Sequence, residues 1–576
     1  MRNRFPIFDV EPTIYFGGEV RPAKAVVNEE IAVRATIIRE GHEPLFAELV
    51  LLGPQRKEVS RAPMREFWPG TDRYEALIRP LVLGTHHFYI EAFGEDRAIS
   101  SRSEDFPIYV ERERALYGAW YEFFPRSEGA IKNRDGSITS GTFVTAEKSL
   151  ARVRDMGFDV LYLPPVHPIG HSFRKGRNNT LTPRATDPGV PWAIGNSDGG
   201  HDAINPELGT MADFEHFVGA AKKLGIEIAM DFALQCSPDH PWASEHREWF
   251  TIRADGTIAY AENPPKKYQD IYPINFDKDY EGILAKCSRI LELWISKGVK
   301  IFRVDNPHTK PVQFWQDLIA RINHLHPEVV FLAEAFTRPA MMGALGKAGF
   351  QQSYTYFTWR TTKHELIEYG TEVSQQSSAY FRPNFWVNTP DILPFHLQSG
   401  EPLIFAQRAL LAATMTPSWG MYAGFELFES ERFKEGGEEY LDSEKYEIKV
   451  RDWDGAVKSG RNLMEFVGAL NQIRASNQAL HGLRNLRFHP TDSDQVLAYS
   501  KRDGQNLILI IVNLDPVHAQ ETYIHWDMYH LGFEAQEFHA TNLLTNQEFE
   551  LHPHSHIRID PAIGKYSVGY ILKVNI

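Results

Sequence analysis

Three short segments carry the carboxylates that could do chemistry in this chain of 576 residues. Asp305, Glu334 and Asp391 each follow a short apolar run that predicts a buried parallel strand. Three acids on one rim, with Arg303 two residues before the first, suit bond breaking at the anomeric carbon of a sugar. No metal-ligand spacing accompanies them, so we expect a reaction that uses neither a metal nor an organic cofactor.

Glycosyl transfer with retention of configuration needs two carboxyl groups with different roles. Asp305 is the expected nucleophile, because Arg303 should point to the same side of its strand and hold the carboxylate ionised. Glu334, at the end of the next strand, is the expected general acid and base. Asp391 is expected to grip ring hydroxyls and distort the sugar. A single carboxylate is usually structural, but three at successive strand ends favour an enzyme.

The elements that must position these acids are those of a (β/α)8 barrel, where catalytic groups gather at the C-terminal ends of the strands. Between residues 113 and 487, short apolar runs alternate with helical patterns, as in parallel β/α units. The expected strands are 118–123, 159–163, 227–231, 300–304, 329–332, 353–357, 384–387 and 418–422. A helix is expected over 213–224, ended by Gly225. Residues 235–280, rich in Pro, Asn and Lys, predict a loop subdomain after the third strand.

The two ends of the chain have a different pattern of apolar and polar residues from the middle. Residues 1–112 and 488–576 contain alternating apolar and polar residues separated by turn residues, which predicts a β-sandwich at each end. The expected fold is therefore α/β: a TIM barrel flanked by an N-terminal and a C-terminal β-sandwich domain.

Composition excludes several classes of partner and site. A formal net charge of -14 argues against nucleic acid as the ligand. The sequence has no apolar run of about 18 residues that could span a membrane, and its first residues lack the apolar segment of a secretion signal. Only two cysteines occur, so a disulfide framework is excluded. We therefore expect a cytoplasmic protein.

Four ordered segments resemble the short regions shared by the α-amylase superfamily, glycoside hydrolase family 13. They are DFAL (231–234), FRVD (302–305), AE (333–334) and NTPD (388–391). Longer words are similar to one branch, the bacterial maltosyltransferases that extend α-1,4-glucans from maltose 1-phosphate. These words are LPPVHPIG (163–170), KGRNN (175–179), DFALQCSPDHPW (231–242), ENPPKKY (262–268), RVDNPHTK (303–310) and SEKY (443–446). The likeness covers nearly all of the chain from about residue 10.

The resemblance implies a retaining transferase. It would move a maltosyl unit from α-maltose 1-phosphate to the non-reducing end of an α-1,4-glucan through a covalent maltosyl-aspartate, with release of phosphate. The phosphate contacts that the resemblance implies are Asn263, Lys266, Tyr268 and Asn306. Their ammonium, phenol and amide groups suit phosphoryl oxygens. The implied maltosyl contacts are Lys175, Asn179, Gln235, Asp391, Lys445 and Tyr446, and Arg303 completes the expected binding set.

Three features depart from the related families. Gln235-Cys236 stands where hydrolases of the superfamily have Asn-His, and Asn388 to Asp391 stands where they have His-Asp, which implies a differently built donor pocket. The helical insertion that these maltosyltransferases carry before the barrel is missing between Phe93 and Asp105. In the family it contributes to a homodimer, so the subunit number stays open.

Two alternatives remain open on the sequence. The first is another hydrolase or transglycosidase of the superfamily that acts on α-glucan without phosphate. The second is a non-catalytic glucan-binding protein with two β-sandwich modules. Within the expected site, His201 in the loop DGGHD (198–202) is open to two interpretations, a loop tether and a sugar contact.

Overall fold

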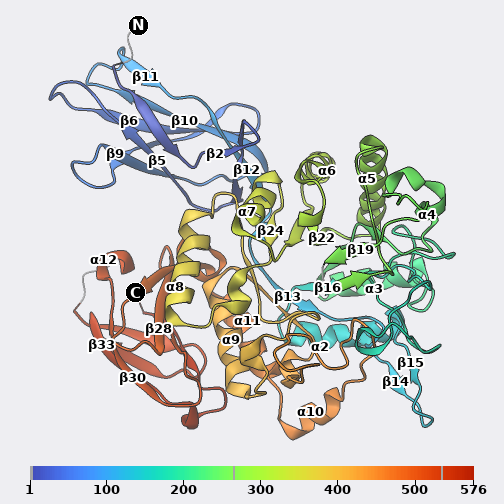
Figure 1. Ribbon diagram of the computed structural model, residues 1–576. Coiled ribbons are helices and arrows are strands. Elements are labelled where there is room, and N and C mark those ends of the chain that lie inside the picture. The colour runs from blue at the N-terminus through green and yellow to red at the C-terminus, as the bar shows by residue number, and fades with distance from the viewer. Residues whose placement is uncertain (1–3, 264–265, 533–535, 576) are drawn as a thin grey trace.

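The computed structural model describes residues 4–263, 266–532 and 536–575, without the side chains of Asn263 and Lys266. An eight-stranded sheet occupies the middle of the chain, and its order is β24-β23-β22-β17-β16-β13-β26-β25 (Figure 1). All of its strand pairs are parallel. An isolated parallel bridge between Ser353 and Pro383 joins the two ends of this order and closes a barrel.

The barrel strands are short and buried, apart from the partly exposed Glu227 at the start of the third strand. They are β13 (Gly118–Glu122), β16 (Val160–Leu163), β17 (Glu227–Phe232), β22 (Ile301–Asp305), β23 (Val330–Glu334), β24 (Gln352–Ser353), β25 (Asn384–Trp386) and β26 (Ser418–Tyr422). The main helices between and after them are α2 (Leu150–Asp155), α3 (Met211–Lys223), α5 (Tyr280–Ser296), α6 (Val312–Leu325), α7 (Pro339–Ala348), α8 (Lys363–Thr371), α9 (Pro402–Met415) and α11 (Met464–Ala475). The TIM barrel expected from the sequence is confirmed.

Helix α3 shows how local chemistry sets the limits of these elements. Thr210 accepts a hydrogen bond from the Asp213 backbone N–H at 3.2 Å, and the Asp213 carboxylate accepts one from the Thr210 N–H at 2.8 Å. This capping box starts the helix at Met211, two residues earlier than the apolar pattern indicates. The helix ends where expected, because Gly225 adopts a φ of +77° that a glycine accepts without strain.

The strand expected over 353–357 is wrong. β24 ends at Ser353, and a 3-10 turn follows at Tyr356–Trp359. The aromatic residues of this run are buried by ring stacking instead of strand pairing: Tyr354 stacks on Trp386 with centroids 5.0 Å apart, and Phe357 stacks on Phe385 at 4.4 Å. An apolar run shows that a segment is buried, but it does not show which partner covers it.

The excursion after the third barrel strand is built from very short elements. It contains β18 (Gln235–Cys236) paired with β21 (Tyr272–Pro273), the hairpin of β19 (Ala261–Asn263) and β20 (Lys266–Tyr268), and helix α4 (Pro241–Glu245). Strands of two or three residues leave no periodic pattern, which is why the sequence indicated only a loop subdomain here.

The N-terminal region forms two antiparallel sheets around a separate apolar core. The first has the order β1 (Ile7–Glu11), β5 (Ile31–Ile37), β9 (Arg73–Ile78) and β8 (Arg65–Glu66). The second has the order β4 (Ala23–Val26), β12 (Phe106–Glu111), β10 (Gly84–Phe93), β6 (Phe46–Leu52) and β7 (Glu58–Pro63), with β11 (Ser100–Arg102) beside β10. Among the residues of this region that the structure describes, β4 and β12 are the strand pair that runs parallel, and the other pairs in the two sheets are antiparallel.

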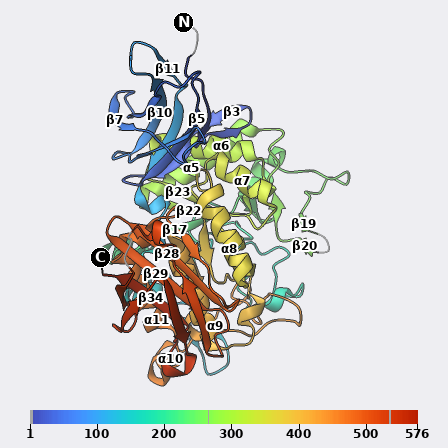
Figure 2. The same cartoon turned by 90° about the vertical axis from the view of Figure 1, so that its left-hand side faces the viewer.

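The C-terminal region is also made of two sheets. The larger has the order β27 (Arg487–His489), β28 (Val496–Asp503), β29 (Asn506–Asn513), β34 (Gly569–Val574), β31 (Phe538–Asn542) and β32 (Glu548–Leu551). The smaller pairs β30 (Gln520–His525) with β33 (His554–Ile559), and the short helix α12 (Met528–Leu531) lies between β30 and β31 in the chain. Figures 1 and 2 place both β-rich regions on the same side of the barrel, the N-terminal one above the C-terminal one. Among the described residues, no helix is long and apolar enough to cross a bilayer.

Candidate active site

Arg303 is the centre of a buried cluster of three carboxylates at the C-terminal ends of β17, β22 and β23. Its Nη1 lies 2.7 Å from Asp231 Oδ2 and 3.0 Å from Asp305 Oδ1, and its Nη2 lies 3.0 Å from Glu334 Oε1. The strand registers explain why these four side chains meet. Arg303 on β22 is paired with Asp231 on β17, and Asp305 on β22 is paired with Glu334 on β23. The contact between Arg303 and Asp305 that strand alternation predicts is therefore present.

Asp231 belongs to the segment DFAL but was not among the expected site residues. Its Oδ2 also accepts a hydrogen bond from the Tyr162 hydroxyl at 2.5 Å and one from Trp192 Nε1 at 3.3 Å. With Arg303, three donors fix this carboxylate, so it holds the arginine in place beneath the other two acids. Burial raises the pKa of Asp231 to about 7, although the guanidinium opposes that rise.

Glu334 carries the electrostatic signature of a general acid. Burial raises its pKa to about 8, against the lowering effect of Arg303, and the negative charges of Asp305 and Asp391 add to the rise. A raised pKa favours the protonated form of Glu334 at neutral pH. A protonated acid beside a carboxylate is the pair that retaining glycosyl transfer requires.

Asn306 connects the two acids. Its backbone N–H donates to Glu334 Oε2 at 3.3 Å, and its side-chain Nδ2 donates to Asp305 Oδ1 at 3.4 Å. A left-handed φ of 40° at Asn306 aims both groups toward the acids immediately after β22. Asparagine tolerates this conformation better than most residues do.

Asp391 does not sit at the end of a strand, and that part of the expectation is wrong. β25 ends at Trp386, and Asp391 lies five residues later in a turn closed by a bridge between Thr389 and Ile392. The turn still brings it to the rim, where its Oδ1 lies 2.8 Å from Lys445 Nζ. Its side chain is 45% exposed, so Asp391 is accessible to a ligand, whereas Asp231, Asp305 and Glu334 are buried.

Lys445 and Tyr446 lie in the loop after the last barrel strand, as expected. Burial lowers the pKa of Lys445, but the nearby Asp391 carboxylate more than offsets this, so the net shift is upward and the ammonium stays charged. The same ammonium lies 5.4 Å from the centre of the Trp192 ring. Burial raises the pKa of Tyr446 to about 12, so its hydroxyl stays protonated.

Lys175 and the residues after β20 form a second polar group at the rim. Lys175 is buried and donates from Nζ to Gln269 Oε1 at 2.8 Å. Next to Gln269, Asp270 is also buried, and its Oδ1 has no hydrogen-bond partner within the described structure. Burial raises the pKa of Asp270, while Lys175 and Lys445 attract its charged form. A buried acceptor without a donor suits a sugar hydroxyl, and the sequence offered no pattern that would single out Asp270.

The remaining expected residues have mixed outcomes. Gln235 donates from Nε2 to the Trp192 carbonyl at 3.3 Å, beside the lysine–aromatic contact. Asn179 is exposed, with a φ of 64°, and no described contact joins it to the acids. Tyr268 is partly buried on β20. The side chains of Asn263 and Lys266 lie outside the described residues, so their expected phosphate contacts stay predictions.

Lys310 is a further cation near the acids that the expected set missed. Its Nζ lies 3.5 Å from the Asp305 carbonyl oxygen and 3.4 Å from the Asn306 carbonyl oxygen. Burial lowers the pKa of Lys310, whereas Asp305 and Glu334 act in the opposite direction. The sequence feature that could have identified Lys310 is its position five residues after Asp305, at the end of the segment RVDNPHTK.

His201 is a loop tether, which resolves the two interpretations left open by the sequence. The Trp242 backbone N–H donates to His240 Nδ1 at 3.0 Å, so the proton of His240 is on Nε2 and points to His201 Nδ1 at 3.1 Å. His201 Nε2–H then donates to the Ala233 carbonyl at 2.8 Å. Burial lowers the pKa of His201 to about 3 and that of His240 to about 2. This neutral relay fixes the chain directly after β17.

Two family models match the parts of the chain outside the barrel. Residues 3–112 match the model described as "Alpha-1,4-glucan:maltose-1-phosphate maltosyltransferase, domain N/S". Residues 488–574 match the model described as "GLGE, C-terminal".

Curated relatives match nearly the whole chain. "Alpha-1,4-glucan:maltose-1-phosphate maltosyltransferase 1" of Streptomyces coelicolor is 48% identical over 652 positions, which cover 99% of this chain and 96% of that relative. The Mycobacterium tuberculosis protein named "Alpha-1,4-glucan:maltose-1-phosphate maltosyltransferase" is 43% identical, with 97% and 94% covered. The first alignment is 76 positions longer than this chain of 576 residues, so at least that many residues of the relative have no counterpart here. This shortfall agrees with the missing insertion noted in the sequence.

Solved structures show the same fold at low identity. The "noncanonic maltogenic alpha-amylase AmyB from Thermotoga neapolitana" superposes with a TM-score of 0.60 at 19% identity, covering 80% of this chain and 99% of that one. A structure titled "Cyclomaltodextrinase" covers 96% of this chain and 98% of its own, with a TM-score of 0.62 at 13% identity.

Proposed function

This chain belongs to the alpha-1,4-glucan:maltose-1-phosphate maltosyltransferase family, and from that premise we propose the reaction that its site performs. The enzyme transfers a maltosyl unit from α-maltose 1-phosphate to the non-reducing end of an α-1,4-glucan and releases inorganic phosphate. The buried cluster in which Arg303 contacts both Asp305 and Glu334 is the observation that carries this proposal.

In the first step the Asp305 carboxylate attacks the anomeric carbon of the donor. The bond from that carbon to the phosphate oxygen breaks, and the Glu334 proton moves to the departing phosphate. Arg303 and the Asn306 side chain orient Asp305, and the Asn306 backbone N–H orients Glu334. The products are a β-maltosyl ester of Asp305 and inorganic phosphate.

In the second step the 4-hydroxyl of the glucan end attacks the same carbon from the opposite face. Glu334, now a carboxylate, takes the hydroxyl proton, and the ester bond to Asp305 breaks. Two inversions give net retention, and both carboxyl groups return to their starting states.

The binding roles are a second part of the proposal. Asp391, partly exposed and paired with Lys445, grips hydroxyls of the sugar at the cleavage point. Lys175, Asn179, Gln235 and Tyr446 hold the rest of the maltosyl unit. Asn263, Lys266, Tyr268 and Asn306 bind the phosphate, and the Lys310 ammonium, which lies against the Asp305 carbonyl, adds positive charge on the side of Asn306.

The test measures phosphate released from α-maltose 1-phosphate in the presence of maltohexaose. We expect release by the unmodified protein, and loss of release in Asp305→Asn. Lys266→Ala should raise the KM for maltose 1-phosphate, because the phosphoryl group loses an ammonium partner. Hydrolysis of maltohexaose without any phosphate-dependent transfer would assign the chain to the phosphate-independent hydrolases of the superfamily. The absence of any turnover would favour a glucan-binding protein.

Three wider proposals accompany the reaction. We propose three domains, 1–112, 113–487 and 488–576, and the separate apolar core of the N-terminal sheets supports the first boundary. We propose a cytoplasmic location, supported by two buried, unpaired cysteines, as is usual in a reducing compartment. We propose a homodimer whose interface forms without the missing insertion, and light scattering on the purified protein tests this.

A further inference from the structure

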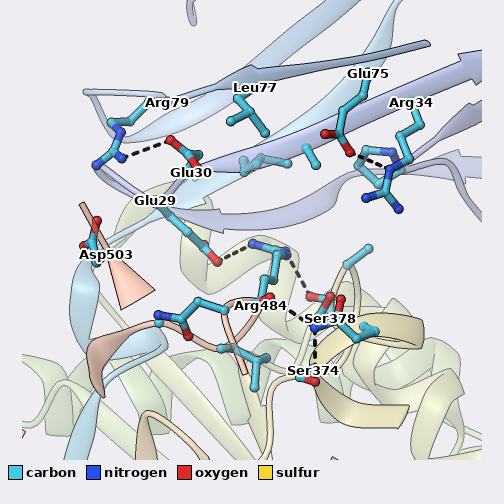
Figure 3. Close-up of a pocket in the computed structure, with 18 of the residues that line it drawn as sticks. Glu29, Glu30, Arg34, Glu75, Leu77, Arg79, Ser374, Ser378, Arg484 and Asp503 are labelled. Carbon is cyan, nitrogen blue, oxygen red and sulfur yellow. Dashed lines mark hydrogen bonds and ion pairs between the residues drawn. The ribbon is translucent and has the colours of Figure 1, made fainter. Parts of the chain in front are cut away.

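A cavity of about 1870 Å³ lies at the end of the barrel that is remote from the catalytic rim (Figure 3). Leu116, which precedes β13, is part of its wall, so the cavity is at the N-terminal ends of the barrel strands. Its charged side chains are largely paired with each other, for example Arg34 with Glu75 at 2.6 Å and Arg79 with Glu30 at 3.2 Å. Groups that contact the donor therefore lie at the opposite end, in the loops that follow the strands.

Two loops that carry predicted donor contacts meet at that opposite end, and together they are called the donor loops below. Residues 175–180 lie after β16 and include Lys175, and residues 442–447 lie after β26 and include Lys445 and Tyr446. In the barrel order β13 stands between β16 and β26, four positions from β23 in either direction around the closed barrel. Asp305 and Glu334 are the last residues of β22 and β23. The donor loops therefore meet across the barrel mouth from the catalytic acids.

Asn178 and Asp442 join the two donor loops by a pair of reciprocal hydrogen bonds. Asn178 Nδ2 donates to Asp442 Oδ1 at 2.9 Å, and the Asp442 backbone N–H donates to Asn178 Oδ1 at 2.8 Å. Both residues have a left-handed φ of 49°, a conformation that persists only where its surroundings hold it. Two bonds of opposite direction fix both the distance and the relative orientation of the loops.

An ion pair beside this contact also joins the donor loops. Arg177 Nε lies 2.7 Å from Glu447 Oε1, and the Glu447 side chain is only 9% exposed. Burial raises the pKa of Glu447 to about 7, Arg177 opposes that rise, and the negative charge of Asp442 adds to it. Two carboxyl groups thus already lie close together at this contact, so a further negative charge here would push the loops apart.

A buried arginine holds the second donor loop from below. Arg126 lies in the loop after β13, and its Nη2 donates to the Glu444 carbonyl at 2.8 Å and to the Lys445 carbonyl at 3.1 Å. The Lys445 ammonium reaches Asp391 at 2.8 Å from this fixed backbone. The position of the loop therefore decides where the Lys445 ammonium stands at the rim.

The two donor loops face a common space. Lys175 comes from the first loop and Lys445 from the second, and both favour the charged form of Asp270, whose pKa burial raises. The Asp270 carboxyl is buried, and its Oδ1 has no hydrogen-bond partner within the described structure. Polar groups from both loops thus converge on one place, on the side of the barrel mouth away from Asp305.

We propose that Asn178 and Asp442 are positioning residues that lock the donor loops together, and that the locked loops form the end wall of the donor pocket and limit the donor to two glucose units. This inference rests on the proposed function, which makes α-maltose 1-phosphate the donor. A donor with a third glucose unit must displace the loops before its anomeric carbon reaches Asp305. Separation of the loops also withdraws Lys175 and Lys445 from the shorter donor.

The experiment exchanges the two partners of the lock. Asn178→Asp places a carboxylate against Asp442 and close to Glu447, so the lock becomes repulsive. The Asn178→Asp/Asp442→Asn double variant restores it, because the new amide at position 442 can donate to the new carboxylate at position 178. The control is Asn546→Asp, the same substitution at an exposed residue of the C-terminal region that also has a left-handed φ, 60°.

Phosphate release is measured with α-maltose 1-phosphate and with α-maltotriose 1-phosphate as donors and maltohexaose as acceptor. Mass spectrometry of the products shows whether two or three glucose units are transferred. For the unmodified protein we expect kcat/KM to be about 100-fold higher with the maltose donor. Asn178→Asp should raise the KM for α-maltose 1-phosphate about tenfold, with kcat within about twofold, and should narrow the preference between donors to about tenfold.

The double variant should return the KM and the donor preference to within about twofold of the unmodified values, and Asn546→Asp should not change them. An unchanged KM in Asn178→Asp, or a double variant that does not recover, would overturn the lock. A KM that rises and recovers while the donor preference stays constant would overturn the end wall. An unmodified protein that releases no phosphate from either donor refutes the proposed function itself, whereas an active protein with unaltered variants refutes this inference alone.

Discussion

Replacement of Arg303 by Met tests the charge balance on which the active site depends. The guanidinium is buried and is in contact with three carboxylates, at 2.7, 3.0 and 3.0 Å. Methionine has a similar length but no charge. In Arg303→Met the three carboxylates therefore lose the cation they share, and the partly buried Lys310, which contacts the Asp305 carbonyl oxygen, is left as a nearby cation. Breaking a buried ion pair from one side typically costs about 3–5 kcal/mol.

The size of the loss can be worked out from the proton that the variant must take up. The least costly relief is to protonate one more carboxyl group, and an aspartic acid in an unfolded chain has a pKa of about 3.9. Holding that proton costs about 1.4 kcal/mol for every pH unit above 3.9, which gives about 1.5 kcal/mol at pH 5 and about 4 kcal/mol at pH 7. The sign follows from linkage: the folded variant binds one proton more than the unfolded chain, so its stability falls as pH rises.

The assay is thermal unfolding of the variant and of the unmodified protein in matched buffers between pH 5 and pH 8. The difference in Tm should widen by about 1 °C per pH unit for a chain of this length, and no phosphate release should remain. Arg34→Met is the matched control, because its pair with Glu75 is partly exposed and should contribute at most about 1 kcal/mol at every pH. A Tm difference that stays constant with pH would show that the three acids do not share the guanidinium charge, and the reasoning would fail.

Three further predictions address other parts of the site. Glu334→Gln should lower kcat by about 10²–10⁴-fold. In the unmodified enzyme we expect the rate to fall as pH rises through about 8, and this fall should be absent in the variant. A pH–rate profile of the unmodified enzyme that is flat up to about pH 10 would contradict the role of Glu334 as general acid. Lys445→Ala removes the cation 2.8 Å from Asp391. Because that ion pair is partly exposed, we expect only about a fivefold rise in the KM for maltose 1-phosphate. Initial rates measure this change, and kcat is the internal comparison. The pKa of His201 is lowered to about 3 in the folded protein, so below pH 6.5 the unfolded chain binds more protons than the folded one and stability is lost as pH falls. His201→Gln should therefore flatten the plot of Tm against pH between about pH 6.5 and 4. An unchanged slope would exclude His201 as a source of the pH-dependent loss of stability.

The sequence was sufficient for the features that depend on local pattern. Short apolar runs followed by acids located the barrel strands and the rim, because a parallel strand is buried on both faces and is exposed only at its end. The side-chain period of two along a strand was enough to place Arg303 beside Asp305. The word similarity indicated the family, since long runs of identical residues encode the site as well as the fold.

The order of the strands in the closed barrel determined the contacts of the active site, which the sequence pattern could not predict. It set β17 beside β22 and β22 beside β23, and only this order makes one guanidinium serve Asp231, Asp305 and Glu334 and raises the pKa of Glu334. It also brought Asp391 to the rim from a turn, and Asp270 from the hairpin excursion. Burial and charge sharing are sums over neighbours in space, so no local run of residues contains them.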